Sequence, residues 1–397
     1  MSFYLFQSAG YLIDVYRGAR AESNLIDFSA FVLAFPQLTM GPILRYDEWR
    51  GALKERTIAR EDIFLGFECF AVGLCFKVLL ADQLAPLWAS LERIGYGYLS
   101  TPLAWLGALK ERTLSREDAF LGFELFAVGL CFKVLLADQL APLWASLERI
   151  GYGYLSTPLA WLGAASYSLQ LYFDFSGYSL MAMGLGQMLG LPVPRNFDLP
   201  YTARSVSEFY RRWHITLGTW FRDYLYIPLG GSRRGKARTA LALTVVWFFT
   251  GLWHGASWNF VLWGIVLLFF ILLEKFCIGS FLKKHALLSH LYLLFVIPPT
   301  WVIFRITKLS DVGAYFSRLF PFFGTHSAVS AQDALKLLSS YWWLLLLGIL
   351  FCLPQPRRFF EKHRGTPLID LPLFVLFWVC VYFIATSTGN AFLYSRF

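Results

Sequence analysis

The sequence predicts an all-α integral membrane protein that crosses the bilayer several times. Of its 397 residues, 57% are hydrophobic and only 15% are charged. Soluble domains are nearer half apolar and a quarter charged, so this composition indicates a hydrocarbon environment. Aromatic residues make up 19% of the chain, which suits the aromatic belts at the two membrane interfaces.

The apolar stretches give the expected positions of the helices. They lie at residues 3–16, 26–44, 63–81, 119–137, 155–192, 239–273, 288–304, 341–353 and 371–385. A spanning helix needs about 20 residues, so the run at 239–273 is expected to form two helices, broken at residues 254–257. Some shorter runs are suited to re-entrant or interfacial helices. We expect roughly eight to eleven membrane helices in one membrane-embedded domain covering residues 1–397.

The net charge of +9 is compatible with two kinds of partner. A basic protein can bind nucleic acid, but in a membrane protein the excess of Lys and Arg is expected in cytoplasmic loops. We therefore expect the lipid bilayer as partner, no nucleic acid, and a multi-pass location in the inner or plasma membrane. No cleavable signal peptide is expected, because no basic region precedes the first apolar residues.

Two consecutive segments are nearly the same. Residues 51–106 recur at 107–162 with a shift of 56, and four pairs of positions differ: Ile58/Leu114, Ala59/Ser115, Ile63/Ala119 and Cys69/Leu125. Solenoid repeats diverge far more and come in at least three copies. We interpret the pair as a recent or artefactual tandem duplication. The second copy runs directly into residues 163–190, and so short a connection costs little closure entropy. We therefore expect the second copy to take the native position.

Asp174 lies inside an otherwise apolar run. A carboxylate at membrane depth costs several kcal/mol unless it is paired. We interpret it first as a structural anchor that ties two helices together, and second as a catalytic group.

Residues 205–225 have the pattern of one amphipathic helix at the membrane interface. Its charged face carries Glu208, Arg211, Arg212, Arg222 and Asp223, and Asp223 is expected to be a supporting polar residue. Either Ser205 or Ser207 is suited to cap the N-terminus. His214 lies at the edge of the apolar arc. A histidine there is more often a hydrogen-bonded polar residue with no chemical role than a residue that takes part in a reaction.

A glycine-containing turn follows at 227–236 and carries Arg233, Arg234 and Lys236. The excess of positive charge places this turn in the cytoplasm. Together with Arg211, Arg212 and Arg222 it forms a basic set that can face anionic lipid or a phosphorylated donor. The spacing is not that of a P-loop, so nucleotide hydrolysis is not expected.

His254 is the most informative ionisable residue. It lies in an apolar run, with Asn259 as a supporting polar residue five positions later. A helix that enters near Arg238 carries His254 about 24 Å along its axis, still inside a hydrocarbon core of about 30 Å. A buried imidazole is disfavoured as a cation, which leaves it neutral and able to accept a proton. No Ser-His-Asp or Cys-His arrangement is nearby, so direct acyl transfer fits better than a covalent intermediate, and no metal site is expected.

Five strings resemble the membrane-bound O-acyltransferase superfamily, and within it the alginate O-acetyltransferase branch. They are 173–179 (FDFSGYS), 195–197 (RNF), 209–215 (FYRRWHI), 220–231 (WFRDYLYIPLGG) and 251–255 (GLWHG). The likeness extends from residues 11–18 to residues 390–394. Family members usually begin with further membrane helices before residues 2–4, and they lack the duplication.

The resemblance implies a helical bundle around a transmembrane tunnel. A cytoplasmic thioester, acetyl-CoA or an acyl-carrier protein, supplies the acyl group, and no cofactor is bound permanently. His254 corresponds to the catalytic histidine and would act as general base. His214 corresponds to the second histidine and would orient the acceptor or stabilise the oxyanion. An extracytoplasmic acetyltransferase is the implied partner, and O-acetylation of an alginate-like cell-surface polysaccharide is the implied function.

Two other functions remain open from the sequence. A D-alanyl transferase acting on teichoic acid belongs to the same superfamily, although residues 227–231 resemble the acetylating branch more. A transporter is a polytopic alternative with buried ionisable residues. Transporters commonly have corresponding halves with broken helices, whereas the repeat here is recent and lacks the histidine motifs.

Overall fold

The computed structural model describes residues 3–32, 46, 116–188, 193–321 and 330–386. Within those residues every regular element is a helix, apart from one isolated bridge between Phe197 and Trp213. The all-α class predicted from the sequence is therefore confirmed.

The elements follow one another as a series of long helices joined by short helical turns. The described elements up to residue 188 are α1 (Phe3–Tyr16), α2 (Leu25–Val32), α7 (Arg116–Cys131), η2 (Phe132–Ala137), α8 (Asp138–Ile150), η3 (Tyr152–Tyr154) and α9 (Thr157–Met188). The middle holds η4 (Pro200–Thr202), α10 (Val206–Arg212), α11 (Ile215–Phe221), η5 (Arg222–Tyr226), α12 (Lys236–His254) and α13 (Trp258–Leu273). The remainder comprises η6 (Glu274–Ile278), α14 (Gly279–Lys284), α15 (Ala286–Arg305), α16 (Leu309–Leu319), α17 (Gln332–Phe351), α18 (Pro354–His363) and α19 (Pro367–Thr386).

Five helical stretches in the described residues are long and apolar enough to span a membrane. They are Asp118–Ile150, Trp258–Lys284, Ala286–Arg305, Gln332–Phe351 and Pro367–Thr386. Each overlaps one of the predicted apolar runs. The predicted run at 63–81 and most of the run at 26–44 lie outside the described residues, so the expected total of helices stays a prediction.

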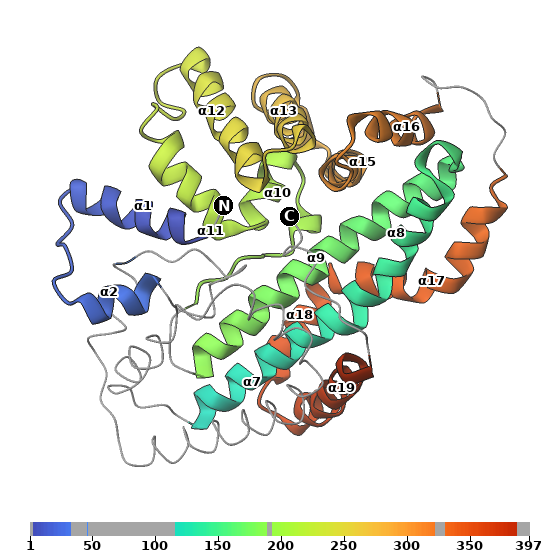
Figure 1. Ribbon diagram of the computed structural model, residues 1–397, viewed down its shortest axis with the longest axis horizontal. Coiled ribbons are helices and arrows are strands. Elements are labelled where there is room, and N and C mark those ends of the chain that lie inside the picture. The colour runs from blue at the N-terminus through green and yellow to red at the C-terminus, as the bar shows by residue number, and fades with distance from the viewer. Residues whose placement is uncertain (1–2, 33–45, 47–115, 189–192, 322–329, 387–397) are drawn as a thin grey trace.

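Helix α9 runs through the middle of the molecule. Helices α7 and α8 lie along one side of it, and α12, α13 and α15 lie on the other (Figure 1). Glycines set the closest approach, because Gly122 and Gly129 of α7 face Gly184 and Gly177 of α9. A Cβ on Gly122 would lie 2.6 Å from the backbone oxygen of Gly184. Small residues at such a crossing let two membrane helices pack backbone to backbone.

The second copy of the duplicated segment is built into this core. Its described part, residues 116–162, supplies α7, η2, α8, η3 and the start of α9. Leu140, Leu143 and Leu147 of α8 are completely buried against the rest of the chain. The first copy, 51–106, lies outside the described residues, so its place stays a prediction.

The expectation of one continuous helix over 205–225 is wrong. The segment divides into α10, α11 and η5, with a break at Trp213 and His214. The break arises because residues 196–198 run alongside it: the Asp198 N–H donates to the Arg212 carbonyl, and the Ile215 N–H donates to the Asn196 carbonyl, both at 2.9 Å. These bonds divert the backbone from the helical path.

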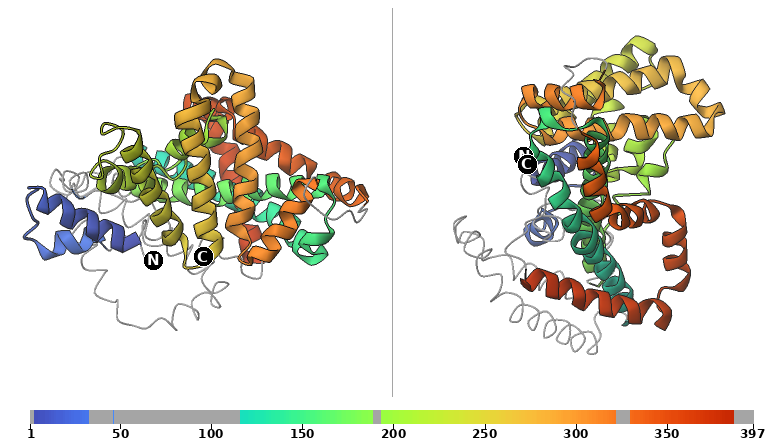
Figure 2. Two further views of the ribbon diagram at one scale, coloured as in Figure 1. Left: turned by 90° about the horizontal axis from the view of Figure 1, so that it is seen from above. Right: turned by 90° about the vertical axis from the view of Figure 1, so that its right-hand side faces the viewer.

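The predicted break within 239–273 is confirmed. Helix α12 ends at His254 and α13 begins at Trp258, and the two run side by side (Figures 1 and 2). Gly251 and Gly264 allow this pairing, since a Cβ on Gly251 would lie 2.7 Å from the Phe260 carbonyl oxygen. His254 is thereby fixed at the end of a helix that is packed closely against its neighbour.

Candidate active site

A cavity of about 1120 Å³ lies among α10, α11, η5, α12, α13, η6, α14 and α15. Both candidate histidines, His214 and His254, line it. Its apolar wall contains Tyr210, Trp263 and Trp301. The chain thus brings together two imidazoles that are 40 positions apart in the sequence, in a space large enough for a small-molecule substrate.

His254 is half-buried and is surrounded by aromatic rings. The centroid of its ring lies 4.7 Å from that of Trp253, 5.1 Å from Trp263 and 4.9 Å from Phe304. These rings come from α12, α13 and α15, so three helices fix the imidazole. An aromatic enclosure excludes water and favours a neutral imidazole, the form that can accept a proton.

His214 is 3% exposed and occupies the break between α10 and α11. Its backbone has φ 46° and ψ 55°, the left-handed conformation. Its ring lies edge-on to Phe175 of α9, with centroids 4.8 Å apart, and 5.9 Å from the ring of Trp253. Trp253 therefore contacts both histidines and couples their positions.

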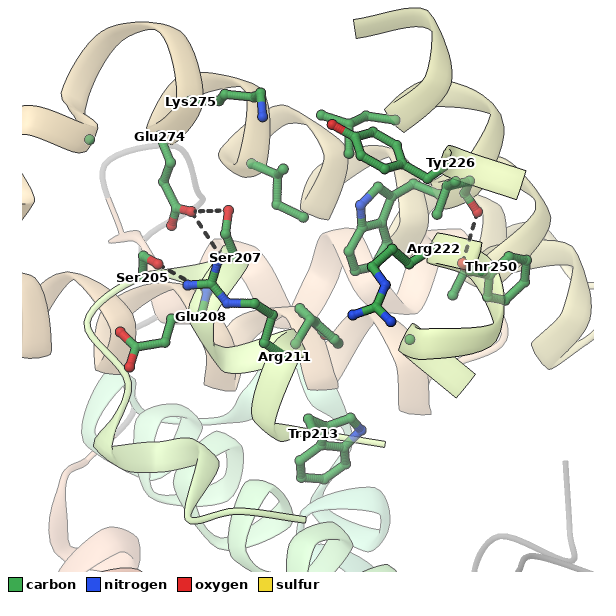
Figure 3. A pocket seen from close by; sticks show the side chains of 18 of the residues that line it. Ser205, Ser207, Glu208, Arg211, Trp213, Arg222, Tyr226, Thr250, Glu274 and Lys275 are labelled. Atoms are coloured by element: carbon green, nitrogen blue, oxygen red, sulfur yellow. Dashed lines mark hydrogen bonds between the residues drawn. The ribbon is translucent and has the colours of Figure 1, made fainter. Parts of the chain in front are cut away.

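Five exposed cations line the cavity. They are Arg204, Arg211, Arg222, Lys275 and Lys283. Arg211 and Arg222 extend from α10 and η5 on one side, whereas Lys275 follows α13 on the other (Figure 3). A cavity with an apolar interior and cations from several elements is suited to a ligand with an anionic end.

Two carboxylates in the same lining are already engaged. Glu274 accepts hydrogen bonds from the Ser207 hydroxyl at 2.6 Å and from the backbone N–H groups of Val206 and Ser207, which caps α10. Burial acts to raise the pKa of Glu208, but hydrogen bonds from the Arg204 N–H and from Arg212 hold that pKa below its ordinary value. Both carboxylates are committed to structural contacts, and the five cations outnumber them, so the described lining of the cavity has a net positive charge.

The remaining basic residues of the predicted set do not line the cavity. Arg212 pairs with Glu208 at 2.7 Å and also donates to Thr202. The side chains of Arg233 and Arg234, on the turn before α12, and of Lys236, the first residue of α12, are exposed. Only Arg211 and Arg222 of that set reach the cavity wall.

The turn itself has the predicted conformation. Gly230, Gly231 and Gly235 all have positive φ, at 110°, 52° and 89°. These are backbone conformations that glycine adopts without steric cost. Asp223, predicted as a supporting polar residue, pairs with its neighbour Arg222 at 2.7 Å.

The other two predicted polar residues tie helices together. Asp174 forms an ion pair with Lys133 at 2.7 Å, which joins α9 to η2. Asn259 donates from Nδ2 to the carbonyl oxygens of Ile303 and Phe304, at 3.2 and 2.9 Å, which joins α13 to α15. Neither side chain lines the cavity. Among the described residues, no group of three His, Cys, Asp or Glu side chains is placed to hold a metal ion.

Sequence reasoning missed several residues of the site. Arg204, Lys275 and Lys283 lie outside the strings that drew attention, and only the fold brings them to the cavity. Asn196 was noted within residues 195–197 but was given no role. Its side chain contacts His214, with 3.2 Å between Asn196 Oδ1 and His214 Nδ1. The only sequence signal was its place in the string at 195–197, which does not identify its partner.

The chain is similar to known proteins over most of its length. Residues 122–307, which include both histidines, match the model of the membrane-bound O-acyltransferase family. The chain is 33% identical over 380 residues to the probable alginate O-acetylase AlgI of Azotobacter vinelandii, covering 94% of this chain and 64% of that protein. The probable alginate O-acetylase AlgI of Pseudomonas syringae pv. tomato is 37% identical over 327 residues, covering 81% and 51%.

The chain belongs to the membrane-bound O-acyltransferase family. Within that family it is more similar to the alginate O-acetylases than to the teichoic acid D-alanyltransferase of Streptococcus thermophilus. That protein is 26% identical over 275 residues, covering 67% of this chain and 54% of its own length. The chain spans about half to two thirds of the length of these relatives.

Proposed function

We propose that this protein is a membrane-bound O-acetyltransferase of the inner membrane. It transfers an acetyl group from a cytoplasmic thioester to a hydroxyl group destined for an alginate-like cell-surface polysaccharide. The observation that carries the proposal is that His214 and His254 line a single cavity whose wall also carries five cations. The similarity to probable alginate O-acetylases supports acetyl as the acyl group.

The chemistry follows from a neutral imidazole in an aromatic enclosure. The acceptor oxygen attacks the thioester carbonyl carbon while His254 takes the hydroxyl proton as general base. The carbon–sulfur bond then breaks, and the proton leaves with the thiolate as a thiol. General-base catalysis of this kind contributes about 10²–10⁴-fold. No metal or bound cofactor takes part in the proposed reaction.

The donor is proposed to be acetyl-CoA or an acetylated carrier protein. Both attach the acyl group through a phosphopantetheine arm, which has an anionic end and an uncharged chain. Arg204, Arg211 and Lys275 would attract the phosphate, and the apolar wall would hold the chain. If the donor is cytoplasmic, the part of the cavity lined by these cations faces the cytoplasm. Labelling of a Ser232→Cys variant from the outer face alone would contradict that orientation.

On the outer side, we propose an extracytoplasmic acetyltransferase that receives the acyl group and passes it to the polysaccharide. The immediate acceptor is then a hydroxyl of that partner or of the glycan itself. Either acceptor supplies the same nucleophile to the cavity, so the roles of His254 and His214 do not depend on which one is used.

The decisive experiment replaces His254. Labelled acetyl-CoA is supplied to membranes that contain the native protein or His254→Ala, and acetyl esters on the cell-envelope glycans are measured by mass spectrometry. We expect His254→Ala to remain in the membrane at native abundance and to lose transfer by at least about 10²-fold. His285→Ala is the matched control, because His285 is exposed and outside the cavity lining.

Three results would count against the proposal. Near-native acetylation by a well-expressed His254→Ala variant would remove the general-base role. D-alanyl esters on the glycans, with no acetyl esters, would assign the protein to the D-alanyl branch instead. A His254-independent flux of solute across the membrane would favour a transporter.

A further inference from the structure

Asn196 makes an unusual set of contacts with the segment that carries His214. Its side-chain oxygen lies 3.2 Å from His214 Nδ1, and it accepts hydrogen bonds from the Thr216 N–H at 3.2 Å and the Thr216 hydroxyl at 3.0 Å. Its backbone oxygen accepts from the Ile215 N–H at 2.9 Å. Asn196 is completely buried. One residue therefore contacts three consecutive positions at the break between α10 and α11.

These contacts determine which His214 nitrogen carries the proton. The Thr216 backbone N–H can only donate, so the side-chain atom of Asn196 that meets it must be the carbonyl oxygen and not the amide nitrogen. That same oxygen faces His214 Nδ1. A carbonyl oxygen only accepts, so His214 Nδ1 must be protonated. In the neutral imidazole, Nε2 then carries the lone pair.

The backbone at His214 is held in place by the same contacts. A left-handed conformation at a residue other than glycine is uncommon and has to be imposed by its surroundings. Here the bonds from Ile215 and Thr216 to Asn196 hold the two residues that follow His214. The conformation turns the His214 ring toward Phe175 and Trp253, against the wall of the cavity.

We propose that Asn196 is a positioning residue that holds His214 as the Nδ1-protonated tautomer, so that Nε2 acts as a hydrogen-bond acceptor in the reaction. The inference rests on the proposed function and decides between the two roles open for His214. A neutral imidazole with its lone pair on Nε2 accepts a hydrogen bond from the acceptor hydroxyl and orients it. It does not donate to the oxyanion of the tetrahedral intermediate.

The test compares three variants by kinetics. Asn196→Ala removes the oxygen that faces His214. Thr216→Val removes one hydrogen bond to the same oxygen and leaves the His214 contact, so it is the matched control for loss of structure. Asn196→Asp keeps an accepting oxygen. We expect kcat to fall roughly 10- to 100-fold in Asn196→Ala, with an unchanged KM for acetyl-CoA, and to stay within about threefold in Thr216→Val. Asn196→Asp should recover part of the loss.

The tautomer itself is read by nitrogen-15 NMR of histidine-labelled protein in lipid nanodiscs. The chain has six histidines, and the His214 signals are identified by their disappearance in His214→Gln. We expect a protonated Nδ1 in the native protein, Thr216→Val and Asn196→Asp, and a mixture of tautomers in Asn196→Ala. If Asn196→Ala does not fold, the native protein and Asn196→Asp still give the result.

The outcomes separate the inference from the proposed function. A protonated Nε2 in the native neutral imidazole would overturn the inference, as would equal losses of kcat in Asn196→Ala and Thr216→Val. An unchanged kcat in a folded Asn196→Ala variant would do the same. Near-native transfer by His214→Ala would instead remove His214 from the proposed reaction, whatever its tautomer.

Discussion

Two regions of this protein bury ionisable side chains, and they do so in different ways. Around α7, η2, α8 and α9, Lys133 lies 2.6 Å from Asp138 and 2.7 Å from Asp174, so opposite charges satisfy one another. Around α10 to α13, His214 and His254 face a shared cavity. The first arrangement joins helices, whereas the second places two imidazoles in the wall of one cavity.

The difference shows what a buried polar residue indicates in a membrane protein. Asp174 and His254 both lie in apolar runs, and by burial alone both are site candidates. What separates them is the partner. A carboxylate with a lysine at 2.7 Å has its charge balanced, while an imidazole at the wall of a cavity has space for a substrate.

The largest effect is expected on folding, from loss of the ion pairs of Lys133. Lys133→Met leaves Asp138 and Asp174 close together without a counter-charge, and Asp174 is 1% exposed. Removing one partner from a buried ion network costs about 3–5 kcal/mol. We expect little folded Lys133→Met protein in the membrane, measured by detergent-resistant monomer and thermal melting. Asp174→Asn should lose less, because Lys133 keeps Asp138.

The duplication supplies a matched control for that prediction. Lys77 is the same residue in the first copy, with the same neighbours in sequence as Lys133. Asp174 pairs with Lys133, so Lys77→Met should leave the folded amount near native. If Lys77→Met is the more damaging of the two, the first copy and not the second supplies the partner of Asp174.

Sequence reasoning located most of the helices because apolar length is a local property. The break at 254–257 was also predictable, since small and polar residues interrupt the run there. The break at Trp213 and His214 was not, because the periodicity over 205–225 continues through it. That break depends on hydrogen bonds from a segment more than ten residues away, and a helical wheel holds no information about such partners.

The site was predictable to a similar degree. The motif strings drew attention to His214 and His254, and the cavity brings the two together. The cations were less predictable. Arg233 and Arg234 form an obvious cluster in the sequence but do not line the cavity, whereas Lys275 follows an apolar run and does. Which charges share a cavity is decided by tertiary packing and not by proximity along the chain.

The two sets of cations can be compared directly. Arg211→Gln with Lys275→Gln removes two charges from the cavity wall, and Arg233→Gln with Arg234→Gln removes two exposed charges outside it. We expect the first pair to raise the KM for acetyl-CoA roughly 10-fold and to weaken its salt dependence, since screening acts on exposed charge. The second pair should change KM less than about twofold. A larger rise in KM from the second pair than from the first would instead indicate that the donor binds at the turn 227–236.

The smallest effect is expected from deleting the first copy, residues 51–106. The described part of the second copy fills the core beside α9 and holds the ion pair with Asp174. It also continues without interruption into α9, so its connection to the helices that follow requires no extra loop. Use of the first copy in its place would leave a 56-residue apolar insertion before α9. The deletion should therefore keep or improve membrane expression, and acetyl transfer should stay within about twofold of native.

Deleting residues 107–162 gives a chain of the same length that differs from the first deletion at only four positions. The two shortened proteins should consequently behave alike, because either copy can then occupy the single position. Loss of transfer in both, from a full-length protein that is active, would show that the protein needs two copies and that the duplication is functional.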